Sequence, residues 1–213
     1  MASAFAHDMN NVLAAVIMRA ELFGMDLPKD VPGRESLKVI EEAANRGIAL
    51  VQRARDLGRL SRPYVPYPVE MTAVVDDARM ALRERLRRDA RCEIVIAPAA
   101  LPEVPGDRAE LALAIQHLIA NALDATTAAG SVRVSTSADD EWVSVQVADS
   151  GEGLTDETRA RAFDPFFSTR GELGRGLGLT VVLTVATRHG GSVELAPAPG
   201  GGTIATLRIP RKR

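Results

Sequence analysis

The first group of residues with chemical potential lies near the start of the chain, in the sequence FAHDMNNVL. It places His7, Asp8 and Asn11 within about one turn of a segment whose apolar spacing is helical. Asp and Asn are poor residues for a helix interior, because their side chains compete for backbone hydrogen bonds. On a helix we expect His7 to face solvent, with Asp8 close enough to hold one ring nitrogen and raise the basicity of the other. The pattern therefore indicates acid–base chemistry, and a helix-capping turn with a solvated histidine is the alternative for this turn taken alone.

A second group of polar residues lies mid-chain, around a stretch that is otherwise apolar. HLIANALDA places Asn121 and Asp124 on a predicted helix, and DSGEG, which begins at Asp149, directly follows a predicted strand. An asparagine can supply a neutral oxygen to Mg²⁺, which keeps several waters and bridges phosphates. A carboxylate at the end of a buried strand can accept a hydrogen bond from an exocyclic amine, such as that of adenine. These residue types favour a nucleotide site.

A glycine-rich stretch follows. FDPFF, which contains Phe166, leads into GRGLGL, which is followed by a predicted helix. Gly174, Gly176 and Gly178 allow backbone N–H groups at a helix N-terminus to surround a phosphate. Separately, GRGLGL is also typical of a loop, DSGEG of a turn, and FDPFF of an apolar surface patch. Their order and spacing together favour phosphate binding.

The N-terminal part of the chain predicts a helical hairpin. Residues 3–27 carry an unbroken apolar heptad stripe, residues 35–62 carry a second helical pattern, and Pro28, Pro32 and Gly33 separate the two. The stripe consists of Met9, Leu13, Val16, Ala20, Phe23 and Leu27. Two such helices joined by a short loop form an antiparallel hairpin. Because both carry more apolar residues than one hairpin can bury, we expect two chains to pair into a four-helix bundle.

The rest of the chain predicts a second domain that mixes helices and strands. We assign residues 1–62 to the hairpin domain, residues 63–69 to a proline-rich linker, and residues 70–213 to the second domain. In the second domain we predict helices at 70–90, 110–126 and 177–189, and strands at 92–97, 132–137, 142–148, 192–195 and 203–209. The predicted fold class is α+β, a helical hairpin followed by an α/β sandwich.

Composition narrows the possible partners and location. The chain has 213 residues, of which 46% are hydrophobic and 25% charged, as in a soluble globular protein. A formal net charge of −2 gives no electrostatic reason to expect nucleic acid or a membrane as the main partner, and we interpret the arginines at 79–91 as a solvated helix face. No apolar run approaches the ~20 residues that span a bilayer. Because Cys92 is the only cysteine, we expect a reducing compartment and therefore a cytoplasmic location.

Taken together, the motifs resemble those of bacterial sensor histidine kinases. FAHDMNNVL resembles the phosphoacceptor box, and HLIANALDA, DSGEGL, FDPFF and GRGLGL are similar to the family's N, G1, F and G2 boxes, in family order. RHGG and GGTIATLRIP are similar to the end of the ATP-binding domain, which the family shares with gyrase-type and Hsp90-type ATPases. The resemblance covers essentially the whole chain and implies the core of a two-component protein-histidine kinase.

The resemblance also implies a role for each matching residue. His7 would be phosphorylated from ATP, Asp8 would be its acid–base partner, and Asn11 would orient a water that dephosphorylates the response regulator. Asn121 would bind Mg²⁺ and Asp149 would bind adenine. The residues expected around the nucleotide, beneath a lid at about 165–177, are His117, Asn121, Asp124, Asp149, Gly151, Gly153, Phe166, Gly174, Gly176 and Gly178. The implied partners are a second copy of the chain and the receiver domain of a response regulator, which takes the phosphoryl group on an aspartate.

One residue departs from the family pattern. Where the N box usually has a second asparagine, one turn before the metal-binding one, this chain has His117. An imidazole can replace a hydrogen bond to phosphate or to metal-bound water, and it can equally slow phosphoryl transfer.

Two alternative functions stay open. One is a phosphotransfer scaffold or phosphatase of this fold that does not use ATP, and the other is a clamp-type ATPase, which has no use for the His7 turn. We expect His189, which precedes two glycines, to be a helix C-terminal residue favoured by the helix dipole.

Overall fold

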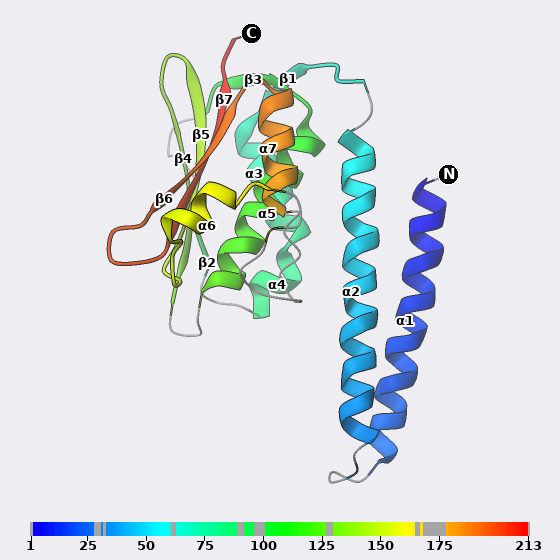
Figure 1. Ribbon diagram of the computed structural model, residues 1–213. Helices are drawn as coiled ribbons and strands as arrows, with labels where there is room; N and C mark the ends of the chain where they lie inside the picture. The colour runs from blue at the N-terminus through cyan, green and yellow to red at the C-terminus, as the bar shows by residue number, and fades with distance from the viewer. Residues whose placement is uncertain are drawn as a thin grey trace. The chain divides into compact units, whose positions relative to one another are not determined.

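The computed structural model divides into two compact units, Met1–Arg62 and Pro63–Arg213. The first unit is helical, and the second combines helices with β-sheet (Figure 1). In the part of the chain that is described, we find no helix with the length and apolar character needed to cross a membrane. The structure describes residues 2–27, 31, 33–60, 63–88, 92–95, 101–126, 130–164, 167 and 178–212.

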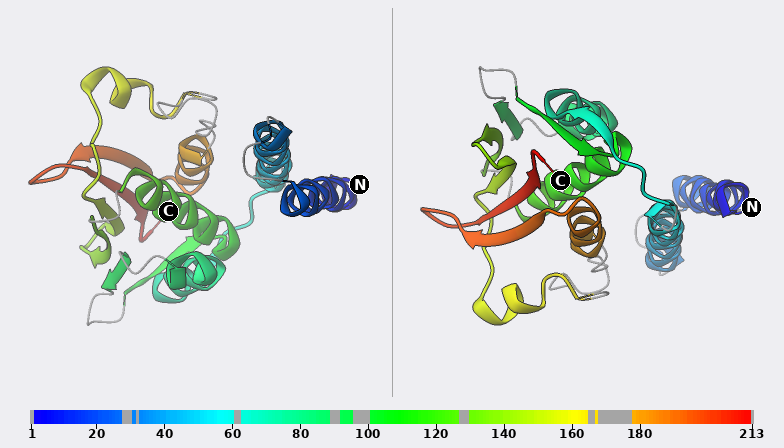
Figure 2. Two further views of the ribbon diagram at one scale, coloured as in Figure 1. Left: turned by 90° about the horizontal axis from the view of Figure 1, so that it is seen from below. Right: turned by 90° about the horizontal axis from the view of Figure 1, so that it is seen from above.

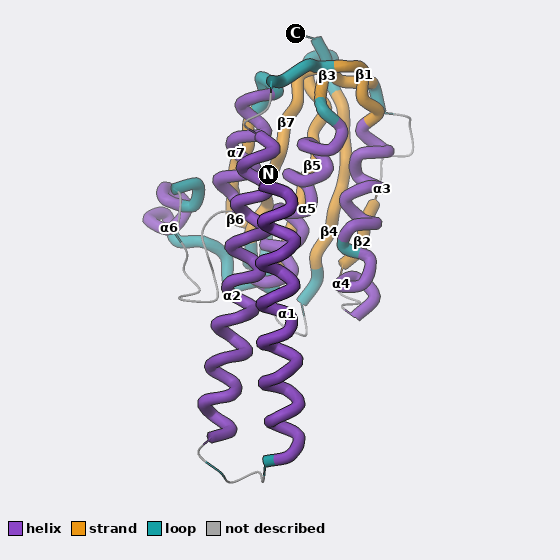
Figure 3. Tube along the Cα trace, turned by 90° about the vertical axis from the view of Figure 1, so that its right-hand side faces the viewer, coloured by secondary structure: helices purple, strands orange, loops and turns teal. Residues whose placement is uncertain are grey.

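The first unit is the predicted helical hairpin. Helix α1 (Ala2–Asp26) and helix α2 (Gly33–Leu60) lie side by side along their length (Figure 3). Small residues allow the close approach: a Cβ atom added to Gly47 would lie 2.8 Å from Cδ1 of Leu13. Ala20 and Ala44 are likewise buried, one on each helix.

Much of the apolar surface of this hairpin remains exposed. Val16 and Phe23 belong to the predicted heptad stripe, yet their exposed fractions are 39% and 68%. Further exposed apolar side chains on the two helices are Val12, Met18, Leu22, Met25, Val39, Ile40 and Leu50. Burying a large aliphatic side chain stabilises a protein by about 1.5–3 kcal/mol, so a surface of this kind favours a covering partner.

The second unit is built on a five-stranded sheet (Figure 2). Its strands, in spatial order, are β2 (Cys92–Val95), β4 (Val132–Ala138), β5 (Trp142–Asp149), β7 (Thr203–Pro210) and β6 (Ser192–Pro197). β2 pairs with β4 in parallel, and the other neighbours are antiparallel. A polar turn joins β4 to β5, and in it Oδ1 of Asp139 accepts hydrogen bonds from the N–H groups of Glu141 and Trp142.

Helices α3 (Met71–Ala81), α5 (Arg108–Ala125) and α7 (Gly178–Arg188) cover one face of this sheet (Figures 1 and 2). The sheet residues alternate accordingly: Val132 and Val134 on β4 are buried and Arg133 between them is exposed. α5 lies at the centre of the core, because it packs against both α3 and α7 as well as the sheet. Its fully buried side chains are Leu111, Ile115, Leu118, Ile119 and Leu123.

The start of α5 is fixed by Asp107. Oδ1 of Asp107 accepts hydrogen bonds from the N–H groups of Ala109, at 2.9 Å, and Glu110, at 3.1 Å. These donors have no partner within a helix, so an N-cap aspartate stabilises the helix by about 1 kcal/mol. The helix therefore begins at Arg108, two residues before the predicted start.

The structure differs in detail from two sequence predictions and adds one short helix. The predicted linker at 63–69 ends early, because β1 (Tyr67–Glu70) pairs antiparallel with β3 (Glu103–Gly106), and Val69 is buried. The predicted helix at 70–90 is interrupted at Leu82 and continues as α4 (Arg83–Arg88). A short helix that was not predicted, α6 (Asp156–Arg161), begins where the Thr155 hydroxyl accepts the N–H of Thr158.

Candidate active site

Asp149 ends β5, and two backbone groups hold its carboxylate. Oδ1 accepts the N–H of Gly151 at 2.9 Å and the N–H of Thr203, at the start of β7, at 3.2 Å. The residue is buried, with 8% of its surface exposed. Both bonds use Oδ1, so the carboxylate is oriented and Oδ2 is the oxygen left for a ligand. A fixed, buried acceptor of this kind can recognise an amino group of a planar base.

Glycines allow neighbouring backbone segments to pack closely around Asp149. A Cβ atom on Gly151 would overlap the carbonyl oxygen of Ala125 and lie 2.8 Å from its carbonyl carbon. A Cβ atom on Gly202 would overlap the carbonyl oxygen of Asp149 and lie 2.7 Å from its carbonyl carbon. Gly153 has φ +74°, a backbone conformation that side-chain-bearing residues rarely adopt. The loop after β5 can therefore pack against the end of α5 and against the turn before β7 only because Gly151 and Gly202 carry no side chain.

A second part of the site lies where α5 faces the start of α7. His117 and Asn121 are one turn apart on α5, and Gly178 is the first residue of α7. A Cβ atom on Gly178 would lie 3.3 Å from Oδ1 of Asn121 and 3.6 Å from Nδ1 of His117. The structure thus brings together an amide, an imidazole and the N-terminus of a helix, the end that attracts anions.

Asp124, three residues after Asn121, is engaged by a basic side chain. Its carboxylate forms an ion pair with the guanidinium of Arg85 on α4, and both side chains are partly exposed. Arg79, on the same arginine-rich stretch, pairs with Asp76 at 3.1 Å. These acidic partners fit the predicted solvated helix face rather than a basic nucleic-acid surface.

The turn from His7 to Asn11, which the sequence predicts to be the phosphoacceptor site, lies on α1 in the other unit. Asp8 and Asn11 are both exposed on this helix. His7 is part of the same helix by its backbone, and its side chain lies outside what the structure describes. Three further predicted residues, Phe166, Gly174 and Gly176, also lie outside the described residues, as does nearly all of the predicted lid.

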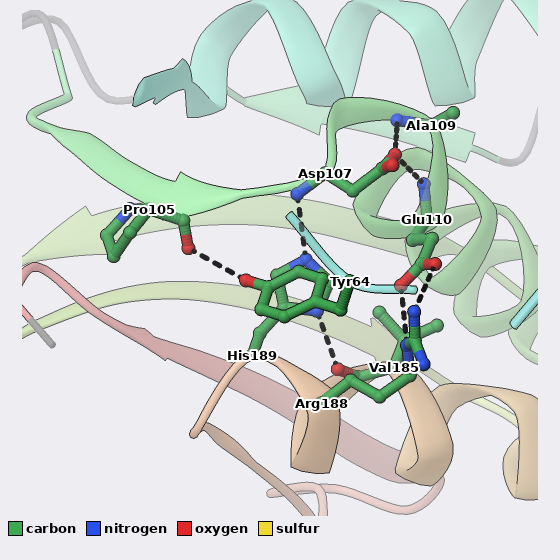
Figure 4. Close-up of polar contacts among 8 residues, drawn as sticks. All are labelled: Tyr64, Pro105, Asp107, Ala109, Glu110, Val185, Arg188 and His189. Carbon is green, nitrogen blue, oxygen red and sulfur yellow. Dashed lines mark hydrogen bonds and ion pairs between the residues drawn. The ribbon is translucent and has the colours of Figure 1, made fainter. Parts of the chain in front are cut away.

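One buried cluster of residues around the ends of α5 and α7 was not predicted (Figure 4). His189 has 1% of its surface exposed, its Nε2 accepts the N–H of Asp107 at 3.0 Å, and its Nδ1 lies 2.8 Å from the carbonyl oxygen of Val185. Burial lowers the pKa of His189 below its usual value of 6.5. The ring is therefore neutral, with its proton on Nδ1. His189 does lie at the C-terminal end of α7, as predicted, but a neutral ring gains little from the helix dipole, so that part of the expectation is wrong.

Neighbouring side chains complete this cluster. Arg188 donates two hydrogen bonds to the carboxylate of Glu110, at 3.0 and 3.1 Å. The Tyr64 ring meets the His189 ring edge-on, with centroids 4.8 Å apart, and its hydroxyl donates to the carbonyl oxygen of Pro105 (Figure 4). The cluster joins the start of α5 to the end of α7, the helices that carry Asn121 and Gly178. The one sequence signal for it is the Asp-x-x-Glu pattern at residues 107–110, which is typical of a helix start.

Two domain families match the chain. Residues 1–63 match the His Kinase A (phospho-acceptor) domain, and residues 106–213 match the histidine kinase-, DNA gyrase B- and HSP90-like ATPase domain. The chain belongs to the histidine kinase family. The match confirms the family that the sequence motifs indicated and the order of its two parts.

Individual histidine kinases resemble the chain over nearly all of its length. It is 30% identical to sensor histidine kinase ZraS of Klebsiella oxytoca over 99% of this chain and 45% of that protein. It is 27% identical to the C4-dicarboxylate transport sensor protein DctS of Rhodobacter capsulatus over 99% of this chain and 33% of that protein. The structure of full-length ShkA in complex with AMPPNP matches with a TM-score of 0.68 and 25% identity, over 98% of this chain and 45% of that one. The chain thus spans less than half the length of these relatives.

The residues present fit a histidine kinase nucleotide site. Oδ1 of Asn121 and Nδ1 of His117 both lie against Gly178, 3.3 and 3.6 Å from the position that a Cβ atom would take there, so both polar groups are next to the N-terminus of α7. Asn121 offers the kind of neutral oxygen that Mg²⁺ accepts alongside phosphates and waters. Among the described residues, no group of three or more His, Cys, Asp or Glu side chains could hold a metal ion. A cation here would therefore depend on the phosphates that arrive with it.

Proposed function

We propose that the chain is the catalytic core of a two-component sensor histidine kinase, which uses ATP and Mg²⁺ to phosphorylate His7 and passes the phosphoryl group to a response regulator. The observation that carries the proposal is the carboxylate of Asp149, which Gly151 and Thr203 orient at the end of a buried strand. The match of residues 1–63 to a phosphoacceptor domain supports the same proposal.

In this proposal the second unit binds and orients ATP. Asp149 accepts a hydrogen bond from the adenine amino group through Oδ2, while Gly151 and Gly153 shape the loop against the base. Gly178, with Gly174 and Gly176 before it in sequence, directs backbone N–H groups at the phosphates. Asn121 holds Mg²⁺, which when bound neutralises charge on the phosphates.

The hairpin supplies the nucleophile. Asp8 holds one ring nitrogen of His7, so that the other carries the lone pair. A bond forms between that nitrogen and the γ-phosphorus while the bond from this phosphorus to the bridging oxygen of ADP breaks, and Asp8 stabilises the charge that develops on the ring. Transfer depends on positioning and charge neutralisation. Asn11, exposed one turn later, orients water for hydrolysis of the phosphorylated regulator.

A second copy of the chain is the proposed partner of the hairpin. The exposed apolar residues of α1 and α2, among them Val16, Phe23 and Ile40, support a four-helix bundle of two hairpins. The exposed positions of Asp8 and Asn11 suit docking of the receiver domain of a response regulator. Cytoplasmic location follows from this role, because ATP and response regulators are cytoplasmic.

The test is incubation of the purified chain with Mg²⁺ and γ-labelled ATP. We expect label that is acid-labile, alkali-stable and absent from a His7→Ala variant, which should still bind AMPPNP with unchanged affinity. An Asp149→Asn variant should lose both label and nucleotide binding. Residual acid-labile label in His7→Ala would contradict the assignment of His7.

The same experiment distinguishes the kinase from the two alternative functions. A chain that neither takes up label nor binds Mg·AMPPNP would favour a phosphotransfer scaffold or phosphatase of this fold. Steady hydrolysis of ATP without phosphohistidine would favour a clamp-type ATPase. Either result would overturn the kinase proposal.

A further inference from the structure

His117 and Asn121 present two potential metal-binding groups from one face of α5. They are four residues apart, the spacing at which helical side chains point to the same side and at which two histidines on a helix hold one metal ion. A Cβ atom on Gly178 would lie 3.3 Å from Oδ1 of Asn121 and 3.6 Å from Nδ1 of His117. Both polar atoms therefore lie next to the first residue of α7.

The two ring nitrogens of His117 are not equivalent. Nε2 is buried within the protein, whereas Nδ1 faces Gly178 at the start of α7. Nδ1 is therefore the nitrogen that a ligand at the start of α7 can reach. Neutral imidazole binds metal ions through either nitrogen, the other one carrying the proton.

The nearest acidic side chain on this helix is already engaged. Asp124 lies three residues beyond Asn121 and forms an ion pair with Arg85. The described residues contain no group of three or more acidic, histidine or cysteine side chains that could hold a metal ion by themselves. A cation at this position would therefore need ligands from outside the protein, such as phosphate oxygens.

We propose that Nδ1 of His117 is a second protein ligand of the nucleotide-bound cation, and that it makes this site prefer Mn²⁺ to Mg²⁺. The inference rests on the proposed function, because it places a nucleotide at Asn121 and Gly178. Mg²⁺ demands near-ideal octahedral oxygen coordination and gives up water reluctantly, whereas imidazole nitrogen suits transition-metal ions. A histidine in this position therefore changes which cation binds best.

The first measurement compares AMPPNP binding to the full chain in Mn²⁺ and in Mg²⁺ by calorimetry. The variants are His117→Asn, which replaces the nitrogen ligand with an oxygen, and Glu194→Gln, an exposed change on β6 that serves as the control. Changes at a single group around a metal typically alter its affinity by 10- to 100-fold, so we expect the Mn²⁺ over Mg²⁺ preference to fall at least about tenfold in His117→Asn and to stay unchanged in Glu194→Gln.

The second measurement detects the bond itself and needs no variant. Pulsed electron paramagnetic resonance of the Mn²⁺·AMPPNP complex should show modulation from a directly bound imidazole nitrogen, and the modulation should change when the chain is labelled with ¹⁵N-histidine. In His117→Asn the modulation should be absent. A complex that binds Mn²⁺·AMPPNP without nitrogen modulation would overturn this inference and leave the kinase proposal standing. Failure to bind AMPPNP with either cation would overturn both.

Discussion

Adding one methyl group at Gly151 should weaken nucleotide binding strongly while the protein still folds. The new Cβ atom would overlap the carbonyl oxygen of Ala125, at the end of α5, and lie 3.0 Å from Oδ1 of Asp149. The loop after β5 must then move, at an overpacking cost of about 1–3 kcal/mol in stability. The movement also breaks the 2.9 Å bond from Gly151 N–H to Asp149. Hydrogen bonds to charged groups contribute about 1.5–3 kcal/mol, so if the Asp149 carboxylate loses this orientation, we expect AMPPNP affinity to fall about 10- to 100-fold.

The assay is calorimetric titration of Gly151→Ala with Mg·AMPPNP, together with thermal unfolding in the absence of nucleotide. Gly58→Ala is the matched control, because nothing lies within 4 Å of a Cβ atom at Gly58 and its helix, α2, tolerates alanine. That control should bind nucleotide normally and gain up to about 1 kcal/mol of stability. A folded Gly151→Ala protein with wild-type AMPPNP affinity would refute the reasoning, because the close approach to Ala125 would then not control Asp149.

Three further predictions concern the cluster at the ends of α5 and α7. Asp107→Ala should lower the free energy of unfolding by about 1 kcal/mol in urea, because two N–H groups of α5 lose their acceptor. Glu110→Gln should lower it by about 1.5–3 kcal/mol, since the paired, partly buried Arg188 loses its carboxylate. Burial lowers the pKa of His189 below 6.5, so the unfolded chain takes up a proton there that the folded chain does not, and stability should fall as the pH drops below about 6.5. Between about pH 7.5 and 5.5 the unfolding free energy of His189→Gln should fall less steeply than that of the wild type, by up to about 1.4 kcal/mol per pH unit; equal slopes would contradict this assignment.

The long elements could be predicted because their signals are local. A heptad stripe defined α1 to within a residue at either end, and alternating valines defined β4 and β5. The same local rules placed Asn121 on a helix and Asp149 at the end of a strand, where the structure has them. Periodicity fixes which element a residue belongs to and which face it occupies.

The contacts that sequence reasoning missed join residues far apart in the chain. β1 pairs with β3, and each of these strands contains a proline, Pro68 or Pro105, a residue that is rare within strands. His189 is neutral because it is buried. It is buried by residues far away in sequence, such as Asp107 and Tyr64, and no pattern around residue 189 reports those neighbours. Gly151 was predicted to lie near the nucleotide, and only the fold shows that it touches Ala125.

α5 connects these observations, because both of its ends are held by contacts from other elements. At its start Asp107 bonds to His189, and at its end Ala125 meets Gly151. With a rise of about 1.5 Å per residue, Asn121 lies about 21 Å along the helix from Asp107. If α5 acted as a rigid rod, weakening its start would displace Asn121 and reduce nucleotide affinity. If only the first turn frays, sites this far apart change each other by less than about 0.5 kcal/mol, which is about a twofold change in affinity. Because the remaining turns of α5 keep their buried leucine and isoleucine contacts, we expect Asp107→Ala to lose stability but to keep AMPPNP affinity within about twofold.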